Sequence, residues 1–339
     1  MHRLTILLLA FFLIAPAESA PRPPEQASVE TVLGWINQYR LRPEPHRVPE
    51  AIRVAGRLGA FKDPESAGVY VGFLAGVLRA NPARAEAMIA KILPLPPDQQ
   101  WALVRAIAYS GLPQWKGLLG GFKMNMPGRG PMIDKYLNGS SATLDQIALL
   151  REKPSLLERL RGKSDEEKKR VVLEPTPDLI DTFWGIYFAN GAYEPVGRLI
   201  DILPLSKDTD DVERLTLGGM AKYTLAQNAA RDHQLLEKLR WSVRYQEKET
   251  AAIIKEVIDA AESVDTAKIR KEVLATIEDL KRKGPGYKRK IAGWGQIGQG
   301  AISLGCIGAA VAGAVVLGLP CVIGGAVSSA AINAWAAQD

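Results

Sequence analysis

The chain contains few of the residues that build disulfide frameworks and metal sites. Its 339 residues include two cysteines and three histidines. Both cysteines, Cys306 and Cys321, lie near the C-terminal end, so the rest of the chain cannot be cross-linked by disulfides. His46 and His233 lie far apart, and neither has a second histidine at metal-ligand spacing. These absences exclude a disulfide-rich fold and argue against a zinc site, and we expect no metal or other cofactor.

Sequence motifs of catalysis are also absent. The chain has no Gly-x-Ser-x-Gly elbow, no His-Glu-x-x-His motif and no phosphate-binding glycine loop after a strand. Carboxylates such as Asp178 and Asp181, or Glu194 and Asp201, have spacings that occur by chance on any charged helix. We therefore expect no catalytic residues. An enzyme that uses carboxylates in a cleft between two helical halves remains an alternative.

Alternating strand patterns are nearly absent, whereas helix-start and helix-stop signals recur. Asn81-Pro82 and Thr176-Pro177 each place a capping side chain before a proline. Glycines follow the expected helix ends at Gly111, Gly139, Gly162 and Gly191. We predict an all-α fold of stacked antiparallel helix pairs, either solenoid-like or an irregular bundle, with a C-terminal apolar Gly/Ala-rich helical hairpin.

Two patterns describe how these helices pack. Gly68, Gly72 and Gly76 are spaced by four residues on one predicted helix, which lets another helix approach closely. The sequence Ile-Leu-Pro-Leu occurs at 92–95 and again at 202–205, an offset of 110 residues. The second pattern suggests a duplicated helical unit.

The N-terminal residues resemble an export signal. A short basic start is followed by an 11-residue apolar run at 4–14 and by the small residues Ala15 and Ala17. The run is too short to cross a bilayer as a helix, because 11 residues span about 16 Å. We expect the chain to be exported, so that the mature protein is periplasmic or extracellular and membrane-associated.

Composition shifts divide the chain. The proline-rich stretch after the signal reads as a linker, and the Gly/Pro-rich segment at 121–131 reads as the division between two helical parts. The predicted segments are a signal peptide at 1–17, a linker at 18–27, helical subdomain 1 at 28–120, a loop at 121–131, helical subdomain 2 at 132–283 and an apolar hairpin at 284–339.

The net charge of +6 comes from one short segment. Residues 281–290 hold six basic and no acidic side chains, which leaves 37 basic and 37 acidic residues elsewhere. Nucleic-acid binding needs positive charge spread over a surface, so we expect no nucleic-acid partner. We expect the basic side chains to contact anionic lipid head groups; they are Lys281, Arg282, Lys283, Lys288, Arg289 and Lys290.

The C-terminal stretch at 291–339 contains one charged side chain, that of the last residue. Trp294 and Trp335 flank it, as aromatic residues do at bilayer interfaces. Pro320 would divide it into two helices of a membrane-inserted hairpin. Small residues would let the two helices pack closely or form an oligomer: Gly300, Gly305, Gly308, Gly313, Gly318, Gly324 and Gly325. Burial of this stretch in the protein's own fold or in an oligomer is the alternative.

Three functional hypotheses follow. The first is an exported, non-enzymatic helical scaffold that binds an unknown protein partner and is held at a membrane by its hairpin. The charge-alternating segment at 231–283 could present the partner-binding face. The second is a secreted membrane-active protein, since a helical body with an apolar hairpin is similar in layout to pore-forming bacteriocins. The third is the carboxylate enzyme described above.

Overall fold

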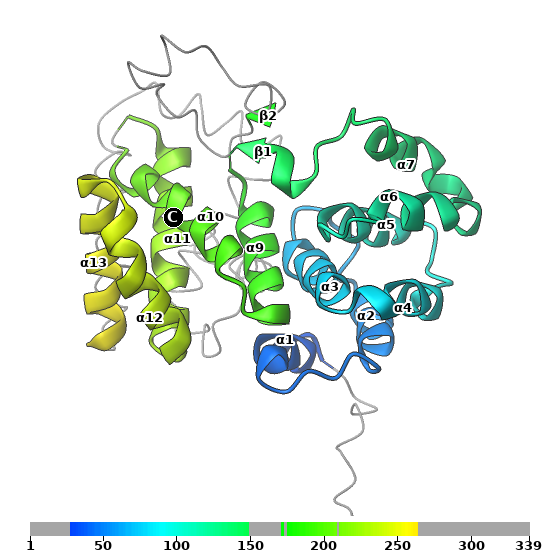
Figure 1. The fold of residues 1–339 in the computed structure, drawn as a ribbon, viewed down its shortest axis with the longest axis horizontal. Helices are drawn as coiled ribbons and strands as arrows, with labels where there is room; N and C mark the ends of the chain where they lie inside the picture. The colour runs from blue at the N-terminus through cyan, green and yellow to red at the C-terminus, as the bar shows by residue number, and fades with distance from the viewer. Residues whose placement is uncertain (1–27, 149–170, 173–174, 209, 264–339) are drawn as a thin grey trace, which may run out of the picture.

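The computed structural model describes residues 28–148, 171–172, 175–208 and 210–263 (Figure 1). The prediction of an all-helical body is confirmed for these residues, apart from one short parallel pairing in which Ile147 and Ala148 of β1 face Val171 and Val172 of β2. The predicted hairpin lies outside the described residues.

The α-helices are α1 (Val29–Gln38), α2 (Val48–Arg57), α3 (Gly68–Ala80), α4 (Ala85–Ile92), α5 (Gln100–Tyr109), α6 (Trp115–Gly121), α7 (Gly130–Leu137), α9 (Pro177–Asn190), α10 (Tyr193–Ile202), α11 (Val212–Ala229), α12 (His233–Ser242) and α13 (Lys248–Glu262). Short 3₁₀ helices join them at η1 (Tyr39–Leu41), η2 (Pro82–Arg84), η3 (Lys123–Asn125), η4 (Pro127–Arg129), η5 (Leu144–Gln146), η7 (Leu203–Lys207) and η8 (Val243–Tyr245).

The glycines predicted to end helices do so at the three positions that the structure describes. Gly191 caps α9 in the left-handed conformation with φ of 66°, and Gly111 and Gly139 have φ of 65° and 80° after α5 and α7. Thr176 and Pro177 begin α9 at the expected position, and Asn81 and Pro82 begin the short η2, but neither Thr176 nor Asn81 makes the predicted capping hydrogen bond. Turn chemistry that is local in sequence therefore determines these boundaries.

The close contact between α3 and α9 forms the centre of the molecule (Figure 1). A methyl group on Gly72 would overlap the backbone of Thr182, and one on Gly76 would lie 2.7 Å from the Cβ of Ala189. Gly185 of α9 faces the backbone of α3 in the same way, at Val69 and Phe73. The glycine stripe predicted to allow close helix approach does so, with a fourth glycine contributed by the partner helix.

The two central helices run in the same direction. Gly68 lies against Asp178, Gly72 against Thr182 and Gly76 against Ile186, so each pair is separated by 110 residues. This is the offset of the Leu-Pro-Leu repeat, whose copies follow α4 and α10. The central pair departs from the predicted antiparallel pairing because these helices are not consecutive. The arrangement agrees with a duplicated helical unit.

The Gly/Pro-rich segment at 121–131 contains the end of α6, then η3 and η4, and the start of α7. Met126 within it is fully buried. Buried residues on both sides of the segment belong to one hydrophobic cluster, which runs from Val32 to Ala261. The core of the described residues is therefore continuous across the segment.

Helix α13 is the last described helix that packs on the hydrophobic core. Its apolar face buries Ile253, Ile254 and Val257 against α11, α12 and η7. Lys222 of α11 is almost fully buried, and its Nζ lies 2.5 Å from the carboxylate of Glu256 on α13. Within the described ranges, no helix combines the length and the apolar character needed to cross a membrane.

Candidate functional site

The residues that the sequence singled out for membrane contact all lie in 264–339. The basic flank, the tail glycines, Trp294 and Trp335 are therefore outside the described residues. The site described below comes from the folded body and was not predicted.

An exposed group of aromatic side chains lies where α10, α12 and η8 meet. We call Tyr193, Trp241 and Tyr245 the aromatic patch. Trp241 is 51% exposed and Tyr245 is 67% exposed. The rings of Trp241 and Tyr245 are tilted with centroids 4.4 Å apart, and Tyr193 meets Trp241 edge-on at 5.6 Å. Two large aromatic rings thus remain in water although they already contact each other.

Helix geometry accounts for the exposure of Trp241. The buried face of α12 is formed by Leu235, Leu239 and Ser242. Trp241 follows Leu239 by two residues, which turns it about 200° around the helix axis and away from the core. Tyr245 follows Trp241 by four residues, which brings the two side chains to the same side. The patch is therefore a consequence of how α12 docks on the body.

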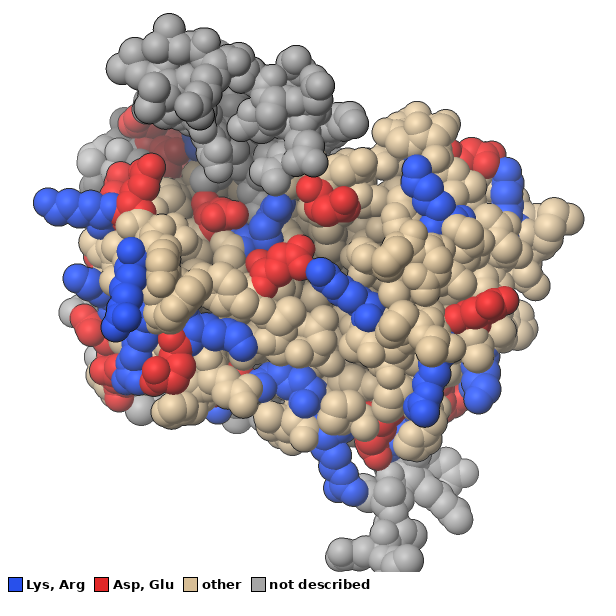
Figure 2. Space-filling view, viewed as in Figure 1, with Lys and Arg blue, Asp and Glu red and all other residues tan. Residues whose placement is uncertain are grey.

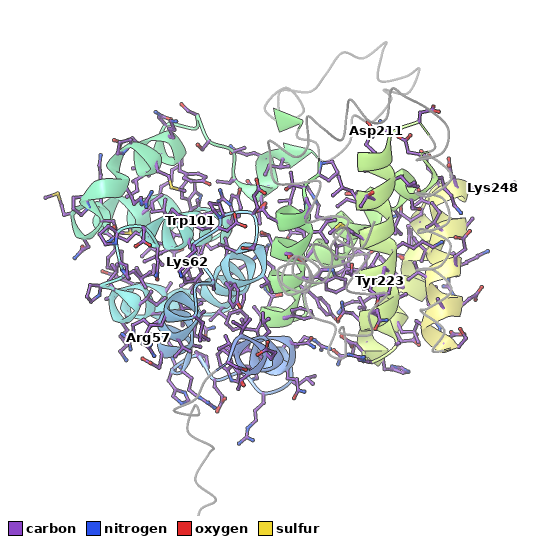
Figure 3. The ribbon with its side chains drawn as sticks, turned by 180° about the vertical axis from the view of Figure 1, so that it is seen from behind. Arg57, Lys62, Trp101, Asp211, Tyr223 and Lys248 are labelled. Carbon is purple, nitrogen blue, oxygen red and sulfur yellow. The ribbon has the colours of Figure 1, made fainter. Side chains whose placement is uncertain are left out.

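The charged side chains around the aromatic patch are only partly paired. Arg240 binds the carboxylates of Glu237 and Glu262, the latter at 2.5 Å. Arg244 and Lys248 are exposed and make no ion pair with any residue that the structure describes. Lys248 stands at the outer edge of the second half in Figure 3. In Figure 2, basic and acidic side chains are intermixed over this end of the viewed face.

The aromatic patch lies beside the point where the described chain ends. Glu262, the last residue of α13, is bound to Arg240, and Arg240 is the immediate neighbour of Trp241. Ser263 follows, and residues 264–339 continue from there. The patch and the start of the C-terminal segment are therefore on the same part of the surface.

A second cluster of polar groups lies at the N-terminal end of α9. Asp178 accepts a hydrogen bond from Thr176 at 3.3 Å and lies 3.4 Å from the guanidinium of Arg105. That guanidinium also stacks over the ring of Trp101, 4.9 Å from its centroid. Burial raises the pKa of Asp178, and the positive charge of Arg105 opposes the rise. The cluster joins α5 to α9.

The negative charges of Glu65 and Asp63 act on the same cluster and add to the rise in the pKa of Asp178. Asp181, three residues further along α9, is fully buried in the core beneath α3. Glu194 points away and pairs with Arg79 at 2.7 Å in an exposed ion pair. Among the described residues, no group of three or more carboxylates, histidines or cysteines could hold a metal ion. Asp178 is engaged in a structural contact between two helices, and we place the candidate site at the aromatic patch.

The sequence contained a weak signal for the aromatic patch. Trp241 and Tyr245 stand four residues apart within the charge-alternating segment that was proposed as a partner-binding face. Aromatic residues at that spacing are more often core residues, and Tyr193 is distant in sequence. No protein-family model, curated protein or solved structure is significantly similar to this chain.

Proposed function

We propose that the protein is an exported, non-enzymatic helical scaffold that is held at a membrane by its C-terminal hairpin, residues 284–339. Its folded body would bind a protein partner on the membrane surface. The observation that carries this proposal is that one hydrophobic core unites the described residues up to Ala261, whereas the stretch at 291–339 is apolar with one charged side chain.

Among the described residues, the apolar face of α13 packs against elements that precede it in the chain. Ile253, Ile254 and Val257 are at most 1% exposed, and among the described residues α11, α12 and η7 pack against their helix. The 49 residues at 291–339 have one charged side chain and need a separate apolar environment. A bilayer provides it, and the six basic side chains at 281–290 suit an anionic membrane surface.

The test compares the full chain with a chain that ends at Lys283. Cells expressing each are fractionated, and membranes are washed with alkaline carbonate, which removes peripheral proteins. We expect only the full chain to resist extraction and the shorter chain to be soluble and helical. A matched pair of full-length variants refines the test. Val315→Arg should abolish resistance, since a central arginine opposes insertion by about 2.5–3.5 kcal/mol, whereas Leu41→Arg on the exposed surface should not.

Two results would contradict the proposal. If both chains are soluble, the apolar stretch is buried in the protein itself or in an oligomer. If the shorter chain is insoluble and unfolded, the body depends on the tail for its core, contrary to the packing of α13.

A further inference from the structure

We infer that the aromatic patch is a membrane-contact surface, at which Trp241 and Tyr245 enter the interfacial region of a phospholipid bilayer. The inference rests on the proposed function, because it assigns a role to the body of a protein that the tail holds at the membrane. The partner is the lipid surface itself, with zwitterionic and anionic head groups.

The chemistry of the side chains fits that partner. Tryptophan and tyrosine have an apolar ring and a polar N–H or O–H, and they concentrate where hydrocarbon meets water. Trp241 and Tyr245 are more than half exposed, whereas Trp184 and Tyr187 of the core are almost fully buried. Burying exposed aromatic rings in the interface recovers apolar area that folding has left in water.

The position of the patch provides the second argument. The last described helix ends at Glu262, which is bonded to the residue next to Trp241. The chain then has 17 residues, 264–280, before the basic flank begins at Lys281. Even a fully extended chain of that length reaches only about 60 Å. The linker therefore keeps the chain exit, and the patch beside it, within about 60 Å of the membrane-bound flank.

Because the tail tethers the body to the membrane, a small patch is sufficient for contact with the bilayer. Three aromatic side chains bind a free bilayer weakly, but a surface that the tail keeps close to the membrane experiences a high effective lipid concentration. Arg244, which lies between Trp241 and Tyr245 in the sequence, is exposed and can approach anionic head groups. The contact would orient the body and leave the opposite side, which carries α4 and α6, turned toward solution (Figure 1).

The experiment measures which tryptophans reach lipid. The starting protein is the full-length chain with the substitutions Trp294→Phe and Trp335→Phe, so that no tryptophan of the tail contributes to the signal. It is bound to vesicles of phosphatidylcholine and phosphatidylglycerol whose acyl chains are brominated near the head group, and bromine quenches only tryptophan within the bilayer. We expect bromine to quench part of the tryptophan fluorescence of this protein. Adding Trp241→Phe should reduce the quenched fraction by more than about twofold. Trp115→Phe, at a partly exposed tryptophan of α6, is the matched control and should leave quenching unchanged.

Each other outcome overturns the inference in a recognisable way. If the protein sediments with vesicles but Trp241 is not quenched, the patch does not contact lipid, and the tail anchor stands. If Trp241 emission is shifted to shorter wavelength without vesicles and Trp241 is not quenched with them, the protein's own tail covers the patch. If the protein does not sediment with vesicles, the membrane function and the inference fail together. Circular dichroism confirms that each variant is folded.

Discussion

Two buried tyrosines show that the contribution of a buried hydroxyl to stability depends on its hydrogen-bond partner. Tyr39 is 3% exposed, packs edge-on against Trp35 and Phe73, and its hydroxyl has no hydrogen-bond partner among the described residues. Burial, together with the negative charge of Glu44, raises the pKa of Tyr39 to about 12. The hydroxyl of Tyr187 instead donates to Asp232 at 2.5 Å. One hydroxyl is desolvated without compensation, and the other is paired with a charge.

The substitution Tyr39→Phe should therefore raise the free energy of unfolding by about 1 kcal/mol, because it removes an unsatisfied buried polar group and keeps the ring. Tyr187→Phe is the matched control and should lower the free energy by about 1–2 kcal/mol, because it removes a hydrogen bond to a charged acceptor. Urea denaturation followed by circular dichroism measures both. A destabilised Tyr39→Phe variant would mean that a buried water binds this hydroxyl in solution.

At the scale of elements, the contact between α3 and α9 depends on glycine. Gly72→Ala would force a methyl group onto the backbone of Thr182, so the helices would have to separate. We expect the free energy of unfolding to fall by about 3 kcal/mol, at the upper end of overpacking effects. Thermal unfolding in urea measures the change. Gly34→Ala in α1 is the control, because no atom lies within 4 Å of its added methyl group. This substitution should raise the free energy of unfolding by about 0.5–1 kcal/mol. Equal effects at both sites would contradict the close approach.

The glycine stripe of α3 could be predicted from sequence, but its partner could not. The spacing of Gly68, Gly72 and Gly76 is local and requires a close neighbour of some kind. Which helix fills that role depends on packing over 110 residues, and no local pattern marks Gly185 as the matching position. Helix ends could be predicted more readily, because the residues that end a helix lie within a few positions of one another in the sequence.

The aromatic patch was missed because exposure is also a non-local property. Helical spacing places Trp241 and Tyr245 on one side of the chain, and aromatic residues at that spacing usually face a core. Only the docking of Leu235 and Leu239 into the body decides that the other side of α12 faces water. Tyr193 joins them from another helix. The sequence could indicate a partner-binding face in this region but not the residues that form it.

At the scale of the whole molecule, the described residues on both sides of the segment at 121–131 share one hydrophobic core. The Gly/Pro-rich segment at 121–131 was predicted to divide two subdomains, yet the largest helix contact joins α3 from one side of it to α9 from the other. Arg40, from the N-terminal part, also binds Asp232 at the start of α12. From both contacts we predict that the described body folds as one cooperative unit.

The fragment 28–137 should consequently fail to fold alone, whereas 28–263 should unfold in a single transition. Without α9, helix α3 loses the cover over its glycine face, although its apolar side chains from Val69 to Leu78 are all buried in the whole body. Exposing only three such apolar side chains costs about 5–9 kcal/mol, which approaches the total stability of about 5–15 kcal/mol for a typical domain. Thermal unfolding followed by circular dichroism compares the transitions of the two chains. Binding of a fluorescent dye compares their exposed apolar surface. A sharp transition and low dye binding for the fragment would show instead that the boundary at 121–131 separates independent domains, and that the contact between α3 and α9 joins two bodies that are already folded.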